Sequence, residues 1–339
     1  MTLHNKNGQT LEVELRPYRP GDAPQIIACI RDAYGDTYVK PCLYTEEGIR
    51  RHEAEGTLCF SVAEVPGGIV AGITAYALSD HFPGMSEVAC QIIRREYNGY
   101  GLALPLALHT MKRAEKLPLN AQYARALGCH LISQKTLDGM GFTACGFLLN
   151  VFNKDLFTHR FENGDYAKIP QSLAVKRQNK TDVGAVWLPD CLVPAAAAMY
   201  CKMGLVWTRR ESASSLSGPD RWNQELDEQH ASLSLRAETC GAAFETNLTA
   251  IVKERLAACG ERVNQTVNLF LNLSRPGSGT AYEIARRLGF FFTGFLPCGP
   301  DGEYMILHHP LKTPVRLDGV PYIPEYAPFM NEIRRCVNT

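Results

Sequence analysis

A repeated pattern of glycine and phenylalanine constrains the fold of this chain more than any other feature. Gly141-Phe142, followed by Gly146-Phe147-Leu148, recurs as Gly289-Phe290, followed by Gly294-Phe295-Leu296, at a constant offset of 148 residues. Each copy ends a helical pattern and opens a strand-like one. A repeat of this length is too long for a solenoid unit and indicates a duplicated domain.

The segments around the two copies agree in pattern as well. They predict the same succession of strand, helix, strand and helix twice, at 87–93 and 233–239, 102–117 and 250–265, 123–127 and 271–275, and 131–140 and 280–288. The length of 339 residues also favours two domains, at roughly 150 residues each. We predict a first domain over residues 1–158, a second over 159–310, and a Pro-rich extended tail over 311–339 that ends in a short helix at 329–336.

The first copy predicts a strand at 11–16, helices at 23–34 and near 45–55, and two antiparallel strands at 58–65 and 68–79. A turn at Pro66-Gly67-Gly68 joins the last two. Residues 160–180 are expected to hold a linker and the first strand of the second copy, and the polar stretch 208–230 a loop. The fold class is therefore α+β, with a mixed, mostly antiparallel sheet flanked by helices in each copy.

Composition excludes several functional classes. Lys plus Arg number 35 and Asp plus Glu also number 35, so no excess positive charge favours nucleic acid or an anionic membrane. The N-terminus has no apolar signal region, and no apolar run reaches the ~18 residues of a membrane span. The twelve cysteines are scattered, without metal-ligand spacing, which favours reduced thiols in the cytoplasm. No metal is expected.

The most informative short segment is Asn98-Gly99-Tyr100-Gly101-Leu102-Ala103, which lies between a strand-like and a helical run. Two glycines directly before a helix allow the backbone to curl so that several N–H groups point outward together. The helix adds a partial positive charge at its N-terminus. Such a turn is suited to a phosphate or pyrophosphate.

Read together, these elements resemble the GNAT superfamily of acetyl-CoA-dependent N-acetyltransferases. Leu15-Arg16-Pro17 with Asp22-Ala23 looks like the family's first strand and helix. The family's phosphate loop has Gln or Arg, two residues, Gly, one residue, and Gly or Ala. Gly101 and Ala103 fit this pattern, and Asn98 departs from its first position.

The family's closing pattern ends in Leu-Gly-Phe, matched here by the helix that leads to Gly141-Phe142. Counting back from Gly141 places His130 where Asn is usual and Leu137 where the general-acid Tyr is usual. A narrower group of uncharacterised bacterial GNAT proteins, some fused to an ATP-binding kinase-like module, is closer. That resemblance is carried by residues 34–38, 130–135, 187–189 and 200–205.

The resemblance implies acetyl-CoA as co-substrate and acetyl transfer to a primary amine of a small molecule or peptide. It implies Glu87 and His130 as catalytic candidates, on the fourth strand and after the fifth. An exposed backbone N–H near Ile93 would polarise the thioester carbonyl. The cofactor-binding candidates are Ile93, Arg94, Arg95, Asn98, Gly99, Tyr100, Gly101, Leu102, Ala103, Ser133 and Lys135.

Two departures leave an alternative open. Leu137 cannot act as the usual acid, and Asn98 offers less reach and charge than Gln or Arg, so a regulatory module that senses acyl-CoA without turnover also fits. Residues 245–251 of the second copy contain no glycine, which predicts a degenerate domain that holds no CoA. The expected partners are the amine acceptor and an ATP-binding kinase-like regulatory protein, with the chain a monomer or a homodimer.

Overall fold

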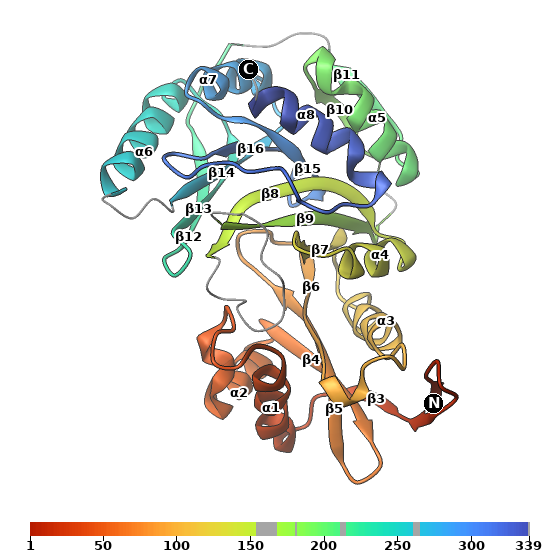
Figure 1. Cartoon of the computed structure of the whole chain (residues 1–339). Helices are drawn as coiled ribbons and strands as arrows, with labels where there is room; N and C mark the ends of the chain where they lie inside the picture. Colours follow the sequence, from red (N-terminus) through yellow and green to blue (C-terminus); the bar gives the residue numbers. More distant parts are fainter. Residues whose placement is uncertain (154–167, 180–181, 211–214, 260–264, 338–339) are drawn as a thin grey trace. The chain divides into compact units, whose positions relative to one another are not determined.

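The computed structural model describes residues 1–153, 168–179, 182–210, 215–259 and 265–337, which form two compact units (Figure 1). Unit 1 comprises Met1–Arg125, and unit 2 comprises the described residues that follow. The elements of unit 1 are β1 Thr2–His4, β2 Thr10–Glu12, β3 Glu14–Pro17, α1 Ala23–Tyr34, α2 Glu46–Glu55, β4 Leu58–Val65, β5 Ile69–Leu78, β6 Met85–Ile93, α3 Ala103–Ala114 and β7 Ala121–Leu127. The last two residues of β7 belong to unit 2.

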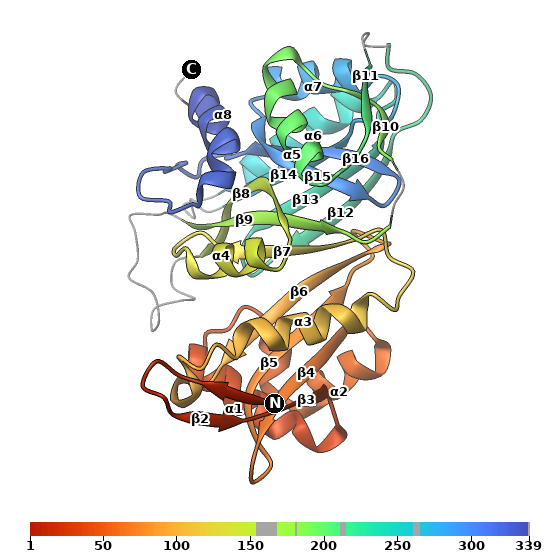
Figure 2. The same ribbon diagram turned by 90° about the vertical axis from the view of Figure 1, so that its right-hand side faces the viewer.

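The main sheet of unit 1 has the strand order β3-β4-β5-β6-β7. Its neighbours are antiparallel except for β6 and β7, which are parallel. The predicted mixed, mostly antiparallel sheet with flanking helices is confirmed in these terms. Strands β1 and β2 form a separate hairpin near the N-terminus (Figure 2). A single strand had been expected at 11–16, but the chain divides it between this hairpin and β3.

Helices cover both faces of this sheet. Figure 1 shows α1 and α2 on the opposite side from α3. The α1–α2 side holds an apolar core of α1, β4, β5 and β6 side chains, among them Ile26, Ile30, Phe60, Ile73 and Ile92. The α3 side holds a smaller core, made of Val13, Ala63, Val65, Ala71, Ile93, Leu102 and Leu106. Helix α3 and the loop before it are therefore anchored on one face, and α1 and α2 on the other.

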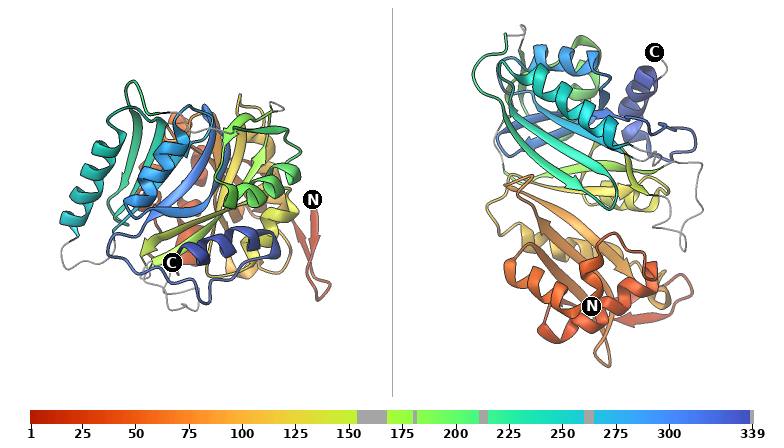
Figure 3. Two further views of the ribbon diagram at one scale, coloured as in Figure 1. Left: turned by 90° about the horizontal axis from the view of Figure 1, so that it is seen from above. Right: turned by 90° about the vertical axis from the view of Figure 1, so that its left-hand side faces the viewer.

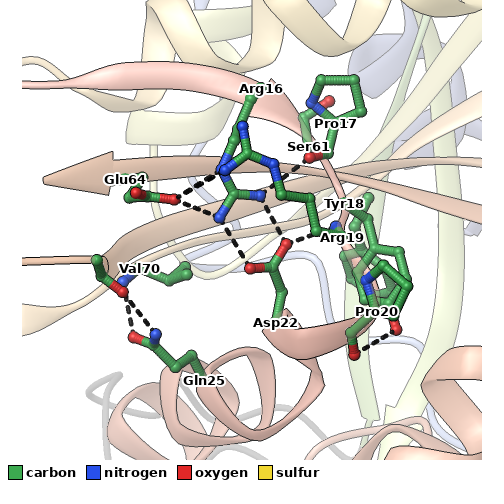
Figure 4. A network of polar contacts seen from close by, with 12 residues as sticks. Arg16, Pro17, Tyr18, Arg19, Pro20, Asp22, Gln25, Ser61, Glu64 and Val70 are labelled. Atoms are coloured by element: carbon green, nitrogen blue, oxygen red, sulfur yellow. Dashed lines mark hydrogen bonds and ion pairs between the residues drawn. The ribbon is translucent and has the colours of Figure 1, made fainter.

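An ion-pair network joins the first sheet strand to α1. The guanidinium of Arg16 on β3 donates to both carboxylate oxygens of Asp22, at 2.7 and 2.8 Å, and to Glu64 on β4 at 2.7 Å (Figure 4). Burial alone would raise the pKa of Asp22, but hydrogen bonds from Arg16 and the Arg19 N–H lower it overall. Arg16 and Asp22, which the resemblance places in the first strand and at the first helix, thus join β3 directly to the start of α1.

Local sequence explains where the helices and turns of unit 1 lie. The Thr45 hydroxyl accepts from the Gly48 N–H at the start of α2, and Gly56 ends that helix with a φ of 69°. Gly67 and Gly68 both adopt positive φ in the turn between β4 and β5, as the predicted hairpin requires.

Unit 2 contains a second group of strands with the order β12-β13-β14-β16-β15-β8-β9 and a small parallel pair, β10 and β11. Helix α6, cyan in Figure 3, lies along one face of these strands. The elements are α4 Ile132–Gly139, β8 Thr143–Asn153, β9 Lys168–Arg177, β10 Gly184–Trp187, α5 Val193–Lys202, β11 Trp207–Arg210, β12 Arg221–Asp227, β13 Ser232–Thr239, α6 Phe244–Ala258, β14 Thr266–Asn272, α7 Ser278–Arg287, β15 Phe291–Gly299, β16 Gly302–His309 and α8 Ala327–Val337.

The order of elements repeats along the chain. The succession β6, α3, β7, α4, β8 recurs as β13, α6, β14, α7, β15, and both β6–β7 and β13–β14 are parallel pairs. Strands β8 and β15 pair with each other at one register, Gly146 opposite Gly294. Within unit 2, the C-terminal segment lies against α4, because the Gln134 side chain both donates to the Pro321 carbonyl and accepts from the Ile323 N–H.

Several sequence-based expectations for unit 2 are wrong. The described part of the stretch 208–230, expected as a loop, contains most of β11 and all of β12. Strand β12 buries few side chains, so its sequence lacks the alternation of apolar residues that would have indicated a strand. The helix expected at 250–265 begins earlier, at Phe244, and residues 260–264 lie outside the described residues. By contrast, the strand expected within residues 160–180 is present as β9, which pairs with β8.

Across the described ranges, none of the helices has both the length and the apolar character needed to cross a bilayer.

Candidate functional site

The loop before α3 presents a row of backbone N–H groups. Gly99 and Gly101 adopt φ of 87° and 72°, and Leu102 returns to the right-handed helical region. Within the described chain, the N–H groups of Gly101, Leu102, Ala103 and Leu104 have no hydrogen-bond acceptor. Pro105 follows, which has no N–H. Four unpaired donors at a helix N-terminus form a concave site for an anion.

The space above this loop is open. A Cβ built on Gly99 or on Gly101 would meet no heavy atom within 4 Å. The loop is held from below, since Leu102 is buried and the Gln91 side chain donates to the Ala103 carbonyl at 2.8 Å. The geometry therefore fits a phosphate or diphosphate group, which needs donors on one side and free volume on the other.

Strands β6 and β7 separate next to this loop. They pair over three registers only, from Met85–Ala121 to Glu87–Tyr123, although β6 continues to Ile93. A bulge at Cys90, whose φ is 53°, bends β6 in the same region. The Arg94 N–H donates to the Ala71 carbonyl on β5, so the Ile93 N–H faces the opposite edge, toward β7. The two strands therefore part beyond Glu87.

Glu87, a predicted catalytic residue, lies at the point where the two strands part. Arg125 on β7 donates to both of its carboxylate oxygens, at 2.9 and 2.8 Å. The Glu87 side chain is 13% exposed and that of Arg125 is 32% exposed. Glu87 is paired with Ala77, which packs on the α1–α2 side of the sheet. Glu87 and the glycine loop therefore approach the gap between β6 and β7 from different faces.

Tyrosine side chains line the connection between α1 and α2. Tyr34 and Tyr38 lie with ring centroids 4.9 Å apart, and the Tyr44 hydroxyl donates to the Gly35 carbonyl. Tyr38 is buried, and its hydroxyl donates to the Cys90 thiol at 3.3 Å. Burial raises the pKa of Tyr38 well above its usual range, so this hydroxyl stays protonated.

The other predicted cofactor residues of unit 1 differ in their surroundings. The Arg94 guanidinium contacts α1, donating to the Cys29 thiol at 3.3 Å and to the Gln25 carbonyl at 3.4 Å. Arg95 and Asn98 are exposed, and Tyr100 is half-buried. The Arg95 N–H donates to Asp32 at the end of α1. Arg95 is thus the more accessible of the two arginines.

His130, Ser133 and Lys135 are described in unit 2. His130 precedes α4 and is half-buried, Ser133 is half-buried in its first turn, and Lys135 is exposed. Leu137, at the position where the family usually has tyrosine, is 7% exposed and packs in the interior of unit 2.

The corresponding region of unit 2 is closed. Strands β13 and β14 pair over six registers, from Ser232–Thr266 to Ala237–Leu271, without a splay. The loop before α6 does contain a glycine, Gly241, which lies just before the positions 245–251 considered in the sequence. Its N–H donates to the Asp220 carboxylate, and the Ala242 N–H donates to the Gly218 carbonyl at 3.1 Å.

Asp220 therefore lies where an anionic ligand would bind at this helix start. Its second carboxylate oxygen accepts from the Asn247 side chain at 2.6 Å. A Cβ on Gly241 would overlap the backbone of residues 218–220, so this loop has no free volume.

Comparisons with known proteins give similarity at the level of structure. The sequence matches no protein-family model and no curated protein. An N-acetyltransferase from Staphylococcus aureus Mu50 is 16% identical, with a TM-score of 0.41, over 50% of this chain and 99% of that chain. A ribosomal-protein-alanine N-acetyltransferase from Brucella melitensis is 18% identical, with a TM-score of 0.40, over 48% and 99%. A GNAT superfamily phosphinothricin acetyltransferase from Sinorhizobium meliloti, in complex with AcCoA, is 17% identical, with a TM-score of 0.39, over 49% and 88%.

Three features that the sequence led us to expect are present in unit 1: the first strand and helix, the antiparallel strands, and the glycine loop before α3. In the order and pairing of these elements, unit 1 agrees with the expected fold. Sequence reasoning missed three residues of the candidate site and of its counterpart in unit 2. Arg125 pairs with Glu87, Cys90 carries the bulge, and Asp220 fills the loop of unit 2. Only spatial proximity identifies Arg125 and Asp220.

Proposed function

We propose that the chain transfers an acetyl group from acetyl-CoA to a primary amine of a small molecule or peptide by direct attack. The observation that carries this proposal is the row of unpaired N–H groups at residues 101–104, open above, beside the parted strands β6 and β7. A ligand with a diphosphate and a long arm would fit this combination, because the arm can follow the gap between the strands.

The residues of the loop are assigned to the diphosphate. The N–H groups of Gly101, Leu102 and Ala103 would donate to it, with Gly99 and Tyr100 shaping the turn and Asn98 offering a side-chain amide. Of the two arginines, we assign Arg95 to a phosphate because its side chain is exposed. The Ile93 N–H would lie toward the thioester. Ser133 and Lys135 remain proposed contacts of the same ligand.

The chemistry requires a neutral amine. A primary amine with a pKa near 10.4 is mostly protonated at pH 7, a handicap of roughly 4.6 kcal/mol. Glu87 lies on the face opposite the loop, where an amine could approach the gap, and its carboxylate can orient the ammonium and pass its proton to water. His130 is the second proposed proton carrier, since its ordinary pKa is near neutrality.

We further propose that the chain is a tandem duplication in which the second GNAT-like domain is degenerate. The repeated order of elements supports this interpretation, as does the pairing of the equivalent glycines Gly146 and Gly294. Asp220 and the unbroken pairing of β13 with β14 are the features expected of a domain that holds no CoA. Each chain would then bind one acetyl-CoA.

A second candidate function is acyl-CoA sensing without turnover. One observation favours it: both oxygens of Glu87 are already held by Arg125, and the usual tyrosine acid is replaced by the buried Leu137. A sensor would retain the loop and need neither a base nor an acid.

Release of free thiol from acetyl-CoA, measured with a panel of amines, tests the proposal. We expect turnover that is lost in Glu87→Gln or His130→Ala while CoA affinity, measured by calorimetry, is retained. Tight CoA binding with no thiol release across the panel would instead support the sensor. Absence of CoA binding would contradict both functions.

The partners follow from the same interpretation. We propose an amine acceptor and an ATP-binding kinase-like regulatory protein, with the chain monomeric or a homodimer. Gel filtration at several protein concentrations, with and without the kinase-like candidate, would measure both associations.

A further inference from the structure

A cysteine in the connection between α1 and α2 lies close to a histidine in α2. Cys42 lies in the short 3₁₀ helix Pro41–Tyr44, and His52 lies in the last turn of α2. The Cys42 Sγ and the His52 Nε2 are 3.4 Å apart. The other ring nitrogen, Nδ1, is 2.8 Å from the Thr57 Oγ1. All three side chains are half-buried, so the group is reachable from solvent.

Thr57 offers His52 an arrangement in which Nδ1 carries the proton. Its hydroxyl donates to the His52 backbone carbonyl at 3.4 Å, which leaves the Thr57 oxygen to accept from Nδ1–H. Nε2 is then unprotonated and is the acceptor for the Cys42 thiol proton. This is the geometry of a nucleophile, a base and a third group that orients the base.

The charges around His52 favour its neutral form. Burial lowers the pKa of His52, and the positive charges of Lys40 and Arg51 lower it further, against a small opposite effect of Glu55. A neutral imidazole can take up the thiol proton, whereas an imidazolium could not.

Gly48 brings Cys42 close to α2. A Cβ at Gly48 would overlap the Cys42 carbonyl oxygen, so only glycine allows the backbone of residue 42 to lie against the first turn of this helix. His52 is one helical turn after Gly48 and therefore lies on the same face. The pair is a consequence of this close approach.

We propose that Cys42 is a nucleophilic thiol, activated by His52, that accepts acyl groups from thioesters. The Cys42 thiol would pass its proton to Nε2, and its sulfur would attack the thioester carbonyl carbon. The bond from that carbon to the donor sulfur breaks, and the departing thiolate takes the proton from the imidazolium. The products are an acyl-Cys42 thioester and a free thiol. One C–S bond forms and one breaks, so no oxidant or reductant is needed.

The other thiols provide internal references. Cys90 is buried, and burial raises the pKa of its thiol to about 11. Cys201 is exposed on α5, and no hydrogen bond joins it to a histidine of the described chain. An activated Cys42 should exceed both in reactivity, although it is less exposed than Cys201.

The first test measures alkylation of each cysteine by iodoacetamide near pH 7, followed by mass spectrometry of the peptides. We expect Cys42 to react at least about tenfold faster than Cys201 in the same sample. His52→Gln should bring Cys42 to the Cys201 rate or below without changing Cys201, and Thr57→Val should have an intermediate effect. Equal rates at Cys42 and Cys201, or no effect of His52→Gln in a variant with an unchanged circular dichroism spectrum, would overturn the proposal.

The second test uses the acyl donors acetyl-CoA and a short acetyl thioester without a nucleotide. We expect both donors to acetylate Cys42. In Cys42→Ser, the peptide that contains position 42 should remain unacetylated. The short thioester should label Cys42 equally in Gly101→Val, because it does not need the loop. Labelling in a protein that acetylates no amine would keep this inference and contradict the proposed function. Alkylation at Cys42 without labelling by either thioester would overturn the inference alone.

Discussion

Gly146 and Gly294 face each other across the only register at which β8 and β15 pair, and they are the equivalent residues of the two sequence repeats. A Cβ on Gly294 would lie 2.6 Å from the Cys145 carbonyl oxygen, and one on Gly146 would lie 2.5 Å from the Thr293 carbonyl oxygen. The two backbones thus approach as closely as glycine permits. A local two-fold axis between the repeats would pass between β8 and β15 at this register, and would place Gly146 opposite its equivalent, Gly294.

Gly294→Ala should therefore destabilise unit 2. Because the added methyl group meets backbone on both sides, we expect a loss of about 1–3 kcal/mol in the free energy of unfolding. Urea unfolding would measure it. Gly139→Ala is the matched control, since a Cβ there meets nothing within 4 Å and lies in helix α4. Equal stability of Gly294→Ala and the wild-type protein would contradict the close approach.

Gly101→Val should abolish CoA binding. The branched side chain would fill the open space above the loop and would also strain a residue whose φ is 72°. Calorimetry with CoA is the measurement. Gly8→Val controls for backbone strain, because Gly8 has a φ of 77° in the exposed N-terminal segment. Unchanged affinity in Gly101→Val would show that the loop is not the phosphate site.

Glu87→Gln should lower turnover by about 10²-fold, the lower end of the usual contribution of a positioned proton carrier, with CoA affinity unchanged. Arg125→Gln removes the two hydrogen bonds that orient Glu87, so we expect a smaller fall in kcat and an altered pH profile. Steady-state kinetics with the preferred amine would give kcat and KM for both. Glu14→Gln, in an exposed ion pair with Arg19, is the control. If both site variants keep full activity, Glu87 is not part of the reaction.

Glu303 should make the stability of unit 2 depend on pH. Burial raises the pKa of Glu303 from its ordinary value of 4.5 to about 7, and the hydrogen bonds from the Cys298 N–H and the Tyr200 hydroxyl only partly oppose this shift. The folded chain keeps this proton over a range in which the unfolded chain has lost it. The contribution of Glu303 to the free energy of unfolding is therefore complete below about pH 4.5. It declines by roughly 3 kcal/mol as the pH rises to about 7.

Urea unfolding at about pH 5 and about pH 8 would measure this decline. Glu303→Gln has no proton to lose; its amide oxygen can still accept from the Cys298 N–H, and its amide N–H can donate to the Tyr200 oxygen. In this variant the difference between the two conditions should shrink by most of that amount. Parallel pH profiles for the variant and the wild-type protein would contradict the role of Glu303.

Sequence reasoning was most successful where a local signal decides the structure. Helix α1 spans Ala23–Tyr34 as predicted because its apolar residues recur at helical spacing, and the turn at Pro66-Gly67-Gly68 follows from glycine's access to positive φ. The glycine loop before α3 was located for the same reason. These features depend on neighbours in the sequence.

It failed where distant residues decide. Strand β12 lies at one edge of its sheet and buries few side chains, so its sequence has the polarity of a loop. A fixed offset placed α6 too late because the two repeats differ in length before this helix. Arg125 and Asp220 carry no motif, and their roles depend on partners far from them in the sequence, at Glu87 and Gly241.

The filled loop of unit 2 has a thermodynamic consequence. The Asp220 carboxylate already accepts from the Gly241 N–H before α6, so a dissolved anion would add no stability at this loop. The open loop of unit 1 behaves differently, since any ligand that binds only the folded state stabilises that state in proportion to the logarithm of its concentration. The melting temperature of unit 1 would thus rise with the concentration of its ligand, while that of unit 2 would stay constant.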